Sequence, residues 1–116
     1  MKIGVVGSRS FNDYQRLEKV LDEMDLSLTD LIVSGGCPKG ADALAEMYAK
    51  NRRMELKVFP ADWERFGKGA GIRRNWYIVR YCDFVVIFWD GVSKGSESVI
   101  RFCCEQKKPF KVIFCS

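Results

Sequence analysis

Three glycine-rich segments of this sequence combine a flexible backbone with hydroxyl and cationic side chains. They are residues 7–10 (GSRS), 34–42 (SGGCPKGAD) and 89–97 (WDGVSKGSE), and each follows an apolar run typical of a buried strand. Glycine lets the backbone approach a ligand, and the free N–H groups at the start of a helix attract anions. Arg9 can pair with phosphate or carboxylate. The segments therefore predict a site for a phosphate-bearing ligand.

A fourth segment, residues 59–75, adds aromatic, acidic and cationic side chains. Trp63 or Phe66 could stack on a base or ring, because each presents a flat apolar face. Trp63 could equally pack on its own loop. Arg74 and Asn75 lie near the predicted start of a helix, and we expect both to face the ligand.

Each glycine segment also has an ordinary explanation, a tight connection between a strand and a helix. None of them is a Walker A loop or a G-x-G-x-x-G fingerprint. The three glycine-rich segments should nevertheless meet at one edge of one sheet, where α/β proteins of this kind bind ligands, and together they indicate a site.

Several kinds of site are excluded or unsupported by composition. The sequence has no histidine, which rules out Ser-His-Asp and Cys-His catalysis and histidine zinc sites. The five cysteines are odd in number and contain no C-x-x-C, so neither a disulfide framework nor a zinc ribbon is indicated, and a cytoplasmic location fits best. No cluster of carboxylates indicates Mg²⁺, so we expect no metal and no obligatory cofactor.

The formal charge of +4 is unevenly distributed, because arginine and lysine outnumber the acidic residues between positions 52 and 80. This pattern favours an anionic partner, although a solvated basic face would look the same in the sequence.

Two hydrophobic periods alternate along the chain and predict an α/β fold. Apolar runs predict strands, and apolar stripes at helical spacing predict helices between them. The predicted strands are 3–6, 31–33, 56–59, 84–88 and 110–114, and the helical stripes are Leu17/Val20/Leu21/Met24, Leu44/Met47/Tyr48, Ile72/Trp76/Val79 and Val99/Ile100/Cys103/Cys104. Five strands and four helices use the whole of residues 1–116 as a single domain with a parallel sheet. Only residues 60–71 read as a long irregular segment, and we find no membrane span.

At these residues the sequence resembles the SLOG superfamily, in particular its small YspA-like group. The pattern of that group runs G-S-R, G-G-x-x-G-A-D, P-A-D-W-E and then A-G and R-N, and the match spans nearly the whole chain. The resemblance implies a Rossmann-like three-layer αβα fold with a five-stranded parallel sheet of order 3-2-1-4-5. It also implies a role in binding or sensing nucleotides or nucleotide-derived ligands, with cleavage of such ligands in some relatives.

The related LOG phosphoribohydrolases carry P-G-G-x-G-T-x-E, and this sequence departs from that motif. Residues 90–98 lack the proline and the paired glycine, and Glu97 stands one position early. One residue of a helix turns a side chain by about 100° around the axis, enough to aim Glu97 away from a ribose that its neighbour would reach.

Residues 34–45 also resemble DNA-processing protein A, which binds single-stranded DNA.

We therefore expect a nucleotide-type small molecule to bind at the carboxyl edge of the sheet. The alternatives are N-glycosidic cleavage, with Asp62 or Glu97 as the catalytic carboxylate, and single-stranded nucleic-acid binding. A homodimer covering Trp76, Tyr77 or Tyr81 is a further expectation. The residues expected to bind the ligand are Gly7, Ser8, Arg9, Gly35, Gly36, Gly40, Asp42, Asp62, Trp63, Arg74, Asn75, Gly91, Gly95 and Ser96.

Overall fold

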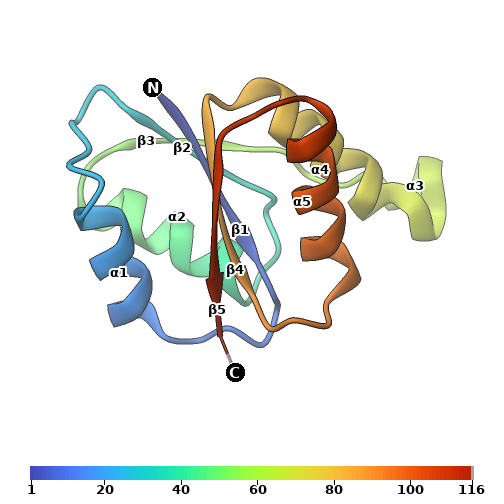
Figure 1. Cartoon of the computed structure of the whole chain (residues 1–116), viewed down its shortest axis with the longest axis horizontal. Coiled ribbons are helices and arrows are strands. Elements are labelled where there is room, and N and C mark those ends of the chain that lie inside the picture. The colour runs from blue at the N-terminus through green and yellow to red at the C-terminus, as the bar shows by residue number, and fades with distance from the viewer. Residues whose placement is uncertain (116) are drawn as a thin grey trace.

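The computed structural model describes residues 1–115, and its strands and helices alternate along the chain (Figure 1). The elements in chain order are β1 (Lys2–Gly7), α1 (Tyr14–Asp22), β2 (Leu31–Ser34), α2 (Ala41–Asn51), β3 (Glu55–Val58), α3 (Trp63–Phe66), a 3-10 turn η1 (Gly67–Gly69), α4 (Ala70–Tyr81), β4 (Phe84–Trp89), α5 (Lys94–Glu105) and β5 (Phe110–Phe114). This order confirms the predicted α/β class.

The five strands form one parallel sheet in the order β3-β2-β1-β4-β5, as the family resemblance implied. The central strand β1 pairs with β2 on one side, where Ile3 is opposite Ile32, and with β4 on the other, where Ile3 is opposite Phe84. The chain leaves β1 in one direction and later returns to its other side. The carboxyl ends of β1 and β4 therefore form the switch point at which open parallel sheets bind ligands.

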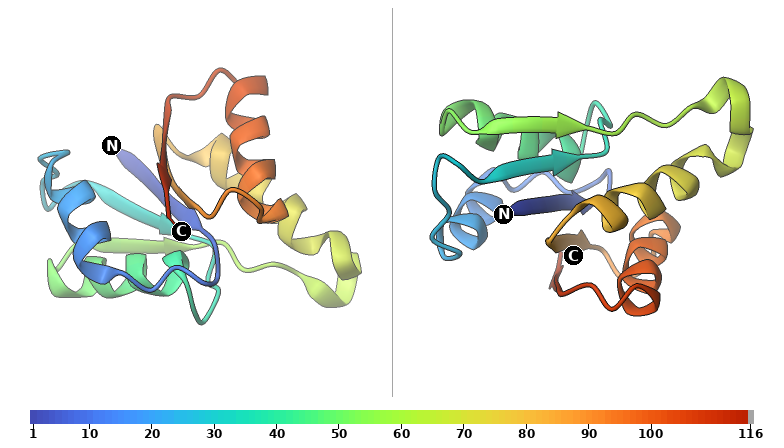
Figure 2. Two further views of the ribbon diagram at one scale, coloured as in Figure 1. Left: turned by 60° about the horizontal axis from the view of Figure 1, so that its bottom comes forward. Right: turned by 90° about the horizontal axis from the view of Figure 1, so that it is seen from above.

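Helices cover both faces of the sheet and make two hydrophobic cores (Figure 2). Side chains of α1 and α2, such as Leu17 and Ala45, pack on one face of β1, β2 and β4. Side chains of α4 and α5, such as Ile78 and Val99, pack on the other face. Within residues 1–115, no helix is long and apolar enough to cross a membrane.

The predicted core face of α4 is wrong in part. Ile72 and Trp76 are exposed, and the helix buries Asn75, Ile78 and Val79 instead. The spacing of apolar residues is misleading here because the exposed side of this helix also carries large apolar side chains.

Two other helices depart from their predicted stripes at single positions. Met47 of α2 is exposed while Tyr48 is buried, and Cys104 of α5 is exposed while Cys103 is buried. In both cases the stripe of buried residues is narrower than the sequence suggests.

The predicted irregular segment 60–71 contains the one-turn helix α3 and the 3-10 turn η1 before α4 begins. These turns project from the body of the molecule, at the right of Figures 1 and 2. Neither turn contributes a buried residue to the core. This projecting segment, residues 60–69, is therefore attached to the fold mainly through α4.

Candidate functional site

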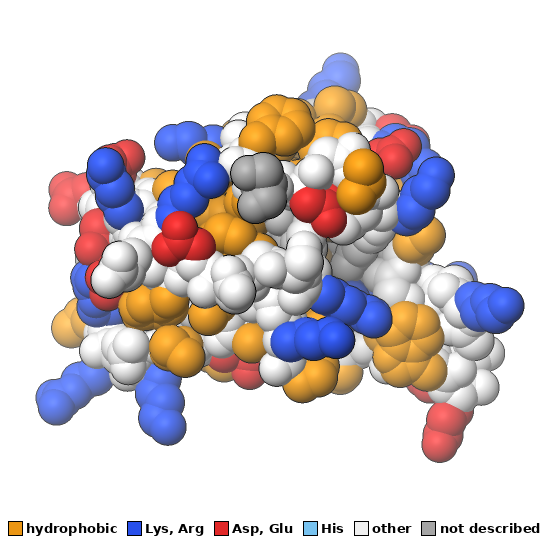
Figure 3. Space-filling model, turned by 90° about the horizontal axis from the view of Figure 1, so that it is seen from below, with side chains coloured by type: hydrophobic (Ala, Val, Ile, Leu, Met, Phe, Trp, Pro, Cys, Tyr) orange, Lys and Arg blue, Asp and Glu red, His pale blue; other side chains and the backbone are white. Residues whose placement is uncertain are grey.

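An open cavity of about 520 Å³ lies at the carboxyl edge of the sheet, at the switch point between β1 and β4. Val6 and Gly7, at the end of β1, line it together with the starts of α4 and α5, which contact each other through the side chain of Asn75 and the carbonyl of Gly95. Figure 3 views this edge of the molecule and shows a hollow between the body and the projecting segment, with Lys and Arg side chains near it. The cavity collects residues from all three glycine-rich segments and from the segment before α4.

Most of the residues expected to bind the ligand line this cavity. Those that do are Gly7, Ser8, Arg9, Asp42, Trp63, Arg74, Asn75, Gly95 and Ser96. They come from five different parts of the chain, which supports the expectation that the segments act together.

The remaining predicted glycines shape loops behind or beside the cavity. Gly36 is exposed, and a Cβ atom there would lie 2.7 Å from Val58 Cγ1. Gly40 precedes α2 with a φ of 78°, and a Cβ atom there would lie 2.5 Å from the Ser8 carbonyl oxygen. Gly35 separates Asp42 from Arg74, while Gly91 stands in an open turn. None of the four lines the cavity.

The two carboxylates proposed for catalysis lie away from the cavity. Asp62 caps α3, where its side chain accepts a hydrogen bond of 3.1 Å from the backbone N–H of Arg65. Glu97 is exposed in the first turn of α5. Neither side chain lines the site.

Ser8 connects three of the loops around the cavity. Its backbone N–H donates to the carbonyl of Phe88 at 2.9 Å, and its carbonyl accepts from the N–H of Ala41 at 3.3 Å. Its hydroxyl accepts from the backbone N–H of Asp90 at 3.1 Å. The loops after β1 and β4 and the start of α2 are thereby held at fixed positions.

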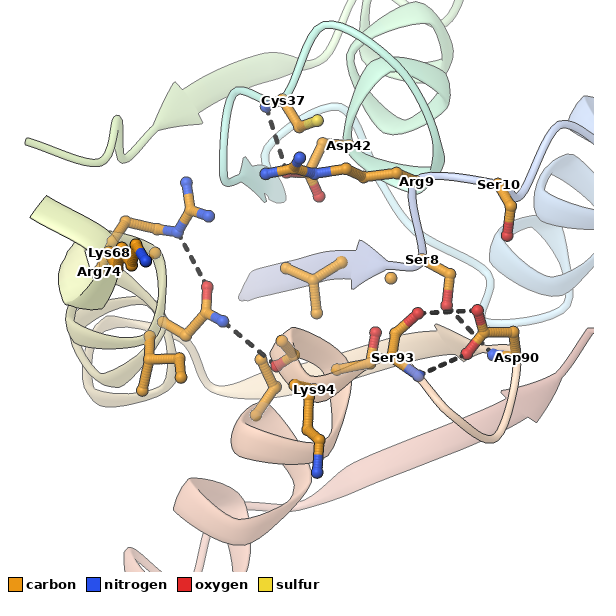
Figure 4. A pocket seen from close by; sticks show the side chains of 18 of the residues that line it. Ser8, Arg9, Ser10, Cys37, Asp42, Lys68, Arg74, Asp90, Ser93 and Lys94 are labelled. Atoms are coloured by element: carbon orange, nitrogen blue, oxygen red, sulfur yellow. Dashed lines mark hydrogen bonds between the residues drawn. The ribbon is translucent and has the colours of Figure 1, made fainter. Parts of the chain in front are cut away.

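Asp90 orders the loop that leads into α5, and the sequence reasoning did not place it in the site. Its carboxylate accepts a hydrogen bond of 2.9 Å from the backbone N–H of Val92. It also accepts from the backbone N–H and the hydroxyl of Ser93, each at 2.7 Å (Figure 4). The backbone bond from Val92, with the others, lowers the pKa of this carboxyl to about 2. An aspartate before Gly91 and three residues before Ser93 is a typical turn pattern, which was the available signal.

Arg74 and Asn75 form a hydrogen-bonded chain across the cavity wall. Arg74 donates through Nη1 to the carbonyls of Gly35 and Phe59, and through Nε to Asn75 Oδ1 at 2.8 Å. Asn75 donates in turn to the Gly95 carbonyl at 3.3 Å. Burial lowers the pKa of Arg74. The chain joins the loops after β2 and β3 to the start of α5.

Asp42, at the start of α2, contributes a buried carboxylate to the cavity. Its side chain is near Arg9 in Figure 4 and accepts a hydrogen bond of 3.2 Å from the backbone N–H of Cys37. Only 7% of the residue is exposed, and this burial raises the pKa of the carboxyl to about 6.

The charged residues of the cavity give it a positive balance. Four cationic side chains, Arg9, Lys68, Arg74 and Lys94, outnumber the carboxylates of Asp42 and Asp90. Lys68 and Lys94 were not predicted as ligand-binding residues, because a single exposed lysine has no distinguishing pattern in a sequence. Within residues 1–115, no group of three or more histidine, cysteine or acidic side chains could hold a metal ion.

A second hollow of about 530 Å³ adjoins the first and shares Arg74 with it. Its wall includes Phe59, Phe66 and Tyr77, and Asp62 lies there rather than in the main cavity. The guanidinium of Arg73 lies 4.1 Å from the centre of the Phe66 ring. This hollow is therefore both aromatic and basic.

Comparisons with known proteins agree with this architecture. Residues 1–66 match the model of the YspA, cpYpsA-related SLOG family. Over 107 residues the chain is 35% identical to the "Gene 61 protein" of Mycobacterium phage D29, and the alignment covers 86% of each protein. No solved structure matches the chain. On the strength of the family match and the parallel 3-2-1-4-5 sheet, we conclude that the chain belongs to the YspA, cpYpsA-related SLOG family.

Proposed function

We propose that the cavity binds one nucleotide or nucleotide-derived ligand, with its phosphate at the start of α5. The observation that carries this proposal is the convergence of Arg9, Arg74 and the α5 amino terminus on one cavity at the switch point of the sheet. Membership of the SLOG family supports a nucleotide-related role.

The start of α5 suits a phosphate because its backbone N–H groups point out of the first helical turn. The first hydrogen bond of α5 runs from the N–H of Glu97 to the Ser93 carbonyl, so the N–H groups of Gly95 and Ser96 precede the helical ladder. Both residues line the cavity. Unbonded N–H groups and the helix dipole together favour an anion there.

The rim of the cavity suits an aromatic base. Trp63 lines the cavity and is 51% exposed, and a Cβ atom on Gly71 would lie 3.3 Å from the indole. The ring therefore lies over the first turn of α4, where a base could stack on its open face. Such stacking contributes about 1–3 kcal/mol per base.

Single-stranded nucleic acid is a second candidate ligand, and the adjoining hollow favours it. Phe66 and Tyr77 offer stacking surfaces, and Arg65 and Arg73 lie beside the Phe66 ring. A strand could pass from one hollow to the other across Arg74, which lines both. Cleavage of an N-glycosidic bond remains the third alternative, although Asp62 and Glu97 lie outside the cavity.

A thermal-shift and calorimetry panel tests these candidates. Adenosine, guanosine, cytidine and uridine monophosphates should raise the melting temperature, because a ligand that binds only the folded state stabilises it. An oligonucleotide of single-stranded DNA should do less. Chromatography of the incubated nucleotides would reveal any free base. The proposal fails if no nucleotide shifts the melting temperature while DNA binds with a steep dependence on salt.

Arg9→Ala is the sharpest variant for this proposal. Arg9 is exposed and lines the cavity, so its removal should leave folding intact while weakening nucleotide binding by about 1.5–3 kcal/mol. Arg80→Ala is the matched control, since Arg80 is also exposed but lies at the far end of α4. Arg74→Ala is less suitable, because Arg74 also bonds two backbone carbonyls. Equal affinities for Arg9→Ala and the native protein would remove Arg9 from the site.

A further inference from the structure

The main cavity contains a carboxylate that has no ion-pair partner. Asp42 is buried and lines the cavity. Within residues 1–115, the ion pairs shorter than 4.0 Å involve Asp30, Glu18, Asp22 and Glu105, and none involves Asp42. A buried charge without a partner is unfavourable unless hydrogen-bond donors surround it. Such a group is either protonated or surrounded by hydrogen-bond donors other than a directly paired arginine or lysine.

The protein donates fewer hydrogen bonds to the Asp42 carboxylate than its two oxygens can accept. The backbone N–H of Cys37 donates to Oδ2 at 3.2 Å. No other hydrogen bond to the side chain of Asp42 occurs within residues 1–115, yet every fully buried side-chain oxygen there has a partner. The second oxygen, Oδ1, is therefore not sealed in the interior. Because Asp42 lines the cavity, this oxygen is available to a bound molecule.

The geometry around Gly35 explains why Arg74 does not neutralise Asp42. A Cβ atom on Gly35 would lie 2.7 Å from Asp42 Oδ2 and 2.9 Å from Arg74 Nη1, so the two groups approach this glycine together. Arg74 Nη1, however, donates to the carbonyls of Gly35 and Phe59. The arginine thus holds the loops in place, and its charge acts on Asp42 at a distance.

Four groups from separate parts of the fold set the charge state of this carboxyl. Arg9, after β1, and Arg74, on α4, favour the ionised form through their charge, and the Cys37 N–H favours it through its hydrogen bond. Glu46, one turn further along α2, favours the protonated form. Burial outweighs all of them and raises the pKa of Asp42 to about 6. The carboxyl is therefore ionised, but incompletely solvated, above that pH.

A phosphate is a poor partner for such a group, because two anions in a confined space repel each other. An ionised carboxylate only accepts hydrogen bonds, so its partner must be a donor. In a nucleotide, the donors between the phosphate and the base are the hydroxyl groups of the sugar.

We infer that Asp42 binds the sugar hydroxyls of the ligand and makes the cavity selective for ribonucleotides over deoxyribonucleotides. The inference rests on the proposed function, with the phosphate at the start of α5 and the base near Trp63. Asp42 stands on α2, across the cavity from the start of α5, as Figure 4 shows for Ser93 and Lys94. A sugar that joins the phosphate to the base then lies within the cavity that Asp42 lines.

The test compares adenosine monophosphate with its 2′-deoxy and 3′-deoxy analogues in calorimetry at pH 7.5. The native protein should bind the ribonucleotide about tenfold more tightly than its 2′-deoxy analogue, the scale of one hydrogen bond to a charged group, and the 3′-deoxy analogue shows whether the second hydroxyl also binds. Asp42→Asn should reduce this preference severalfold, because an amide accepts more weakly than a carboxylate. Glu55→Gln is the control and should keep the preference, since Glu55 is exposed at the start of β3 and lies outside the cavity lining.

The pH dependence supplies an independent readout. A hydroxyl that donates to the ionised carboxylate lowers the pKa of Asp42, so binding should release protons near pH 6 and weaken below it. Calorimetry in two buffers of different ionisation enthalpy measures that release. The release should be smaller in Asp42→Asn, where only the phosphate of the nucleotide still loses a proton on binding. Binding that strengthens as the pH falls, with proton uptake, would instead place the phosphate beside Asp42 and overturn the inference.

The outcomes separate this inference from the function on which it rests. If ribose and deoxyribose nucleotides bind equally well to the native protein, the selectivity is wrong while the nucleotide site stands. If no nucleotide binds, the proposed function itself fails. A measurement of melting temperature shows whether Asp42→Asn is folded, and Asp42→Ser provides a smaller replacement if it is not.

Discussion

At the scale of single residues, Asp42 is expected to make the stability of the free protein depend on pH. Its pKa is raised from the usual 3.8 to about 6 by burial. A raised pKa means that the folded state binds the proton more tightly than the unfolded state. The contribution of protonated Asp42 to the free energy of unfolding is therefore complete below pH 4, and it is lost as the pH rises through 6. Two pKa units correspond to roughly 3 kcal/mol in the free energy of unfolding.

Urea unfolding of the native protein and of Asp42→Asn measures this contribution as a difference. The variant should gain stability relative to the native protein between pH 4 and pH 7. Using the difference cancels the opposite trend from carboxyls with lowered pKa values, such as Asp90, Asp22 and Asp30. A difference that stays constant over this pH range would show that Asp42 titrates normally.

Much of the candidate site follows from residue types, but not the role of each residue. Gly7, Ser8 and Arg9 were expected beside a ligand, and they line the cavity. The burial of Asp42 was not foreseeable, because it depends on how closely α2 approaches the loop after β1. Asp62, expected at the ligand, caps α3 and lies outside the cavity lining.

At the scale of elements, Gly40 sets the distance between the start of α2 and the loop after β1. Its φ is 78°, and a Cβ atom would lie 2.5 Å from both the Ser8 carbonyl oxygen and the Arg9 Cα. Gly40→Ala should lower the free energy of unfolding by about 2–4 kcal/mol, because the new methyl group would strain a left-handed turn and meet rigid backbone.

Gly95→Ala is the control for this substitution in chemical denaturation. Gly95 lies in the first turn of α5, and a Cβ atom there would have nothing within 4 Å. Alanine should change stability by less than about 1 kcal/mol, in the stabilising direction. Similar losses in both variants would contradict the assigned role of Gly40.

The pattern of elements was predictable because strands and helices here have different hydrophobic periods. The run from Phe84 to Phe88 is buried from Val85 onward, as expected for a central strand covered on both faces. The face of α4 was not predictable from period alone, since Ile72 and Trp76 lie outside the core. Apolar spacing cannot separate side chains that pack in a core from those that are exposed on the other side of the same helix.

At the scale of the whole molecule, the projecting segment, residues 60–69, should be the first site of tryptic cleavage. Neither α3 nor η1 contains a buried residue, and Gly67 and Gly69 have open space around them. A protease needs a locally opened chain, which is least costly where few contacts are lost. The first cuts should follow Arg65 and Lys68, as mass spectrometry of early fragments would show.

A ligand that stacks on Trp63 should slow these cuts, and the double variant Arg65→Gln, Lys68→Gln should remove them. First cuts in α1 or α2 would mean that the least stable part of the molecule lies elsewhere.

The exposed Trp76 and Tyr77 remain a predicted interface between two copies of the chain, which sedimentation would test.

The central position of β1 also matters while the chain is being synthesised. The strand is made first, but its second neighbour, β4, begins only at Phe84. At usual translation rates of about 5–20 residues per second, β1 waits roughly 4–15 seconds for that partner. During this interval one edge of the strand stays open to other nascent chains. The contacts of Ser8 with Phe88 and Asp90 can form only after β4 has been made, and the pairing with β4 also covers the open edge of β1.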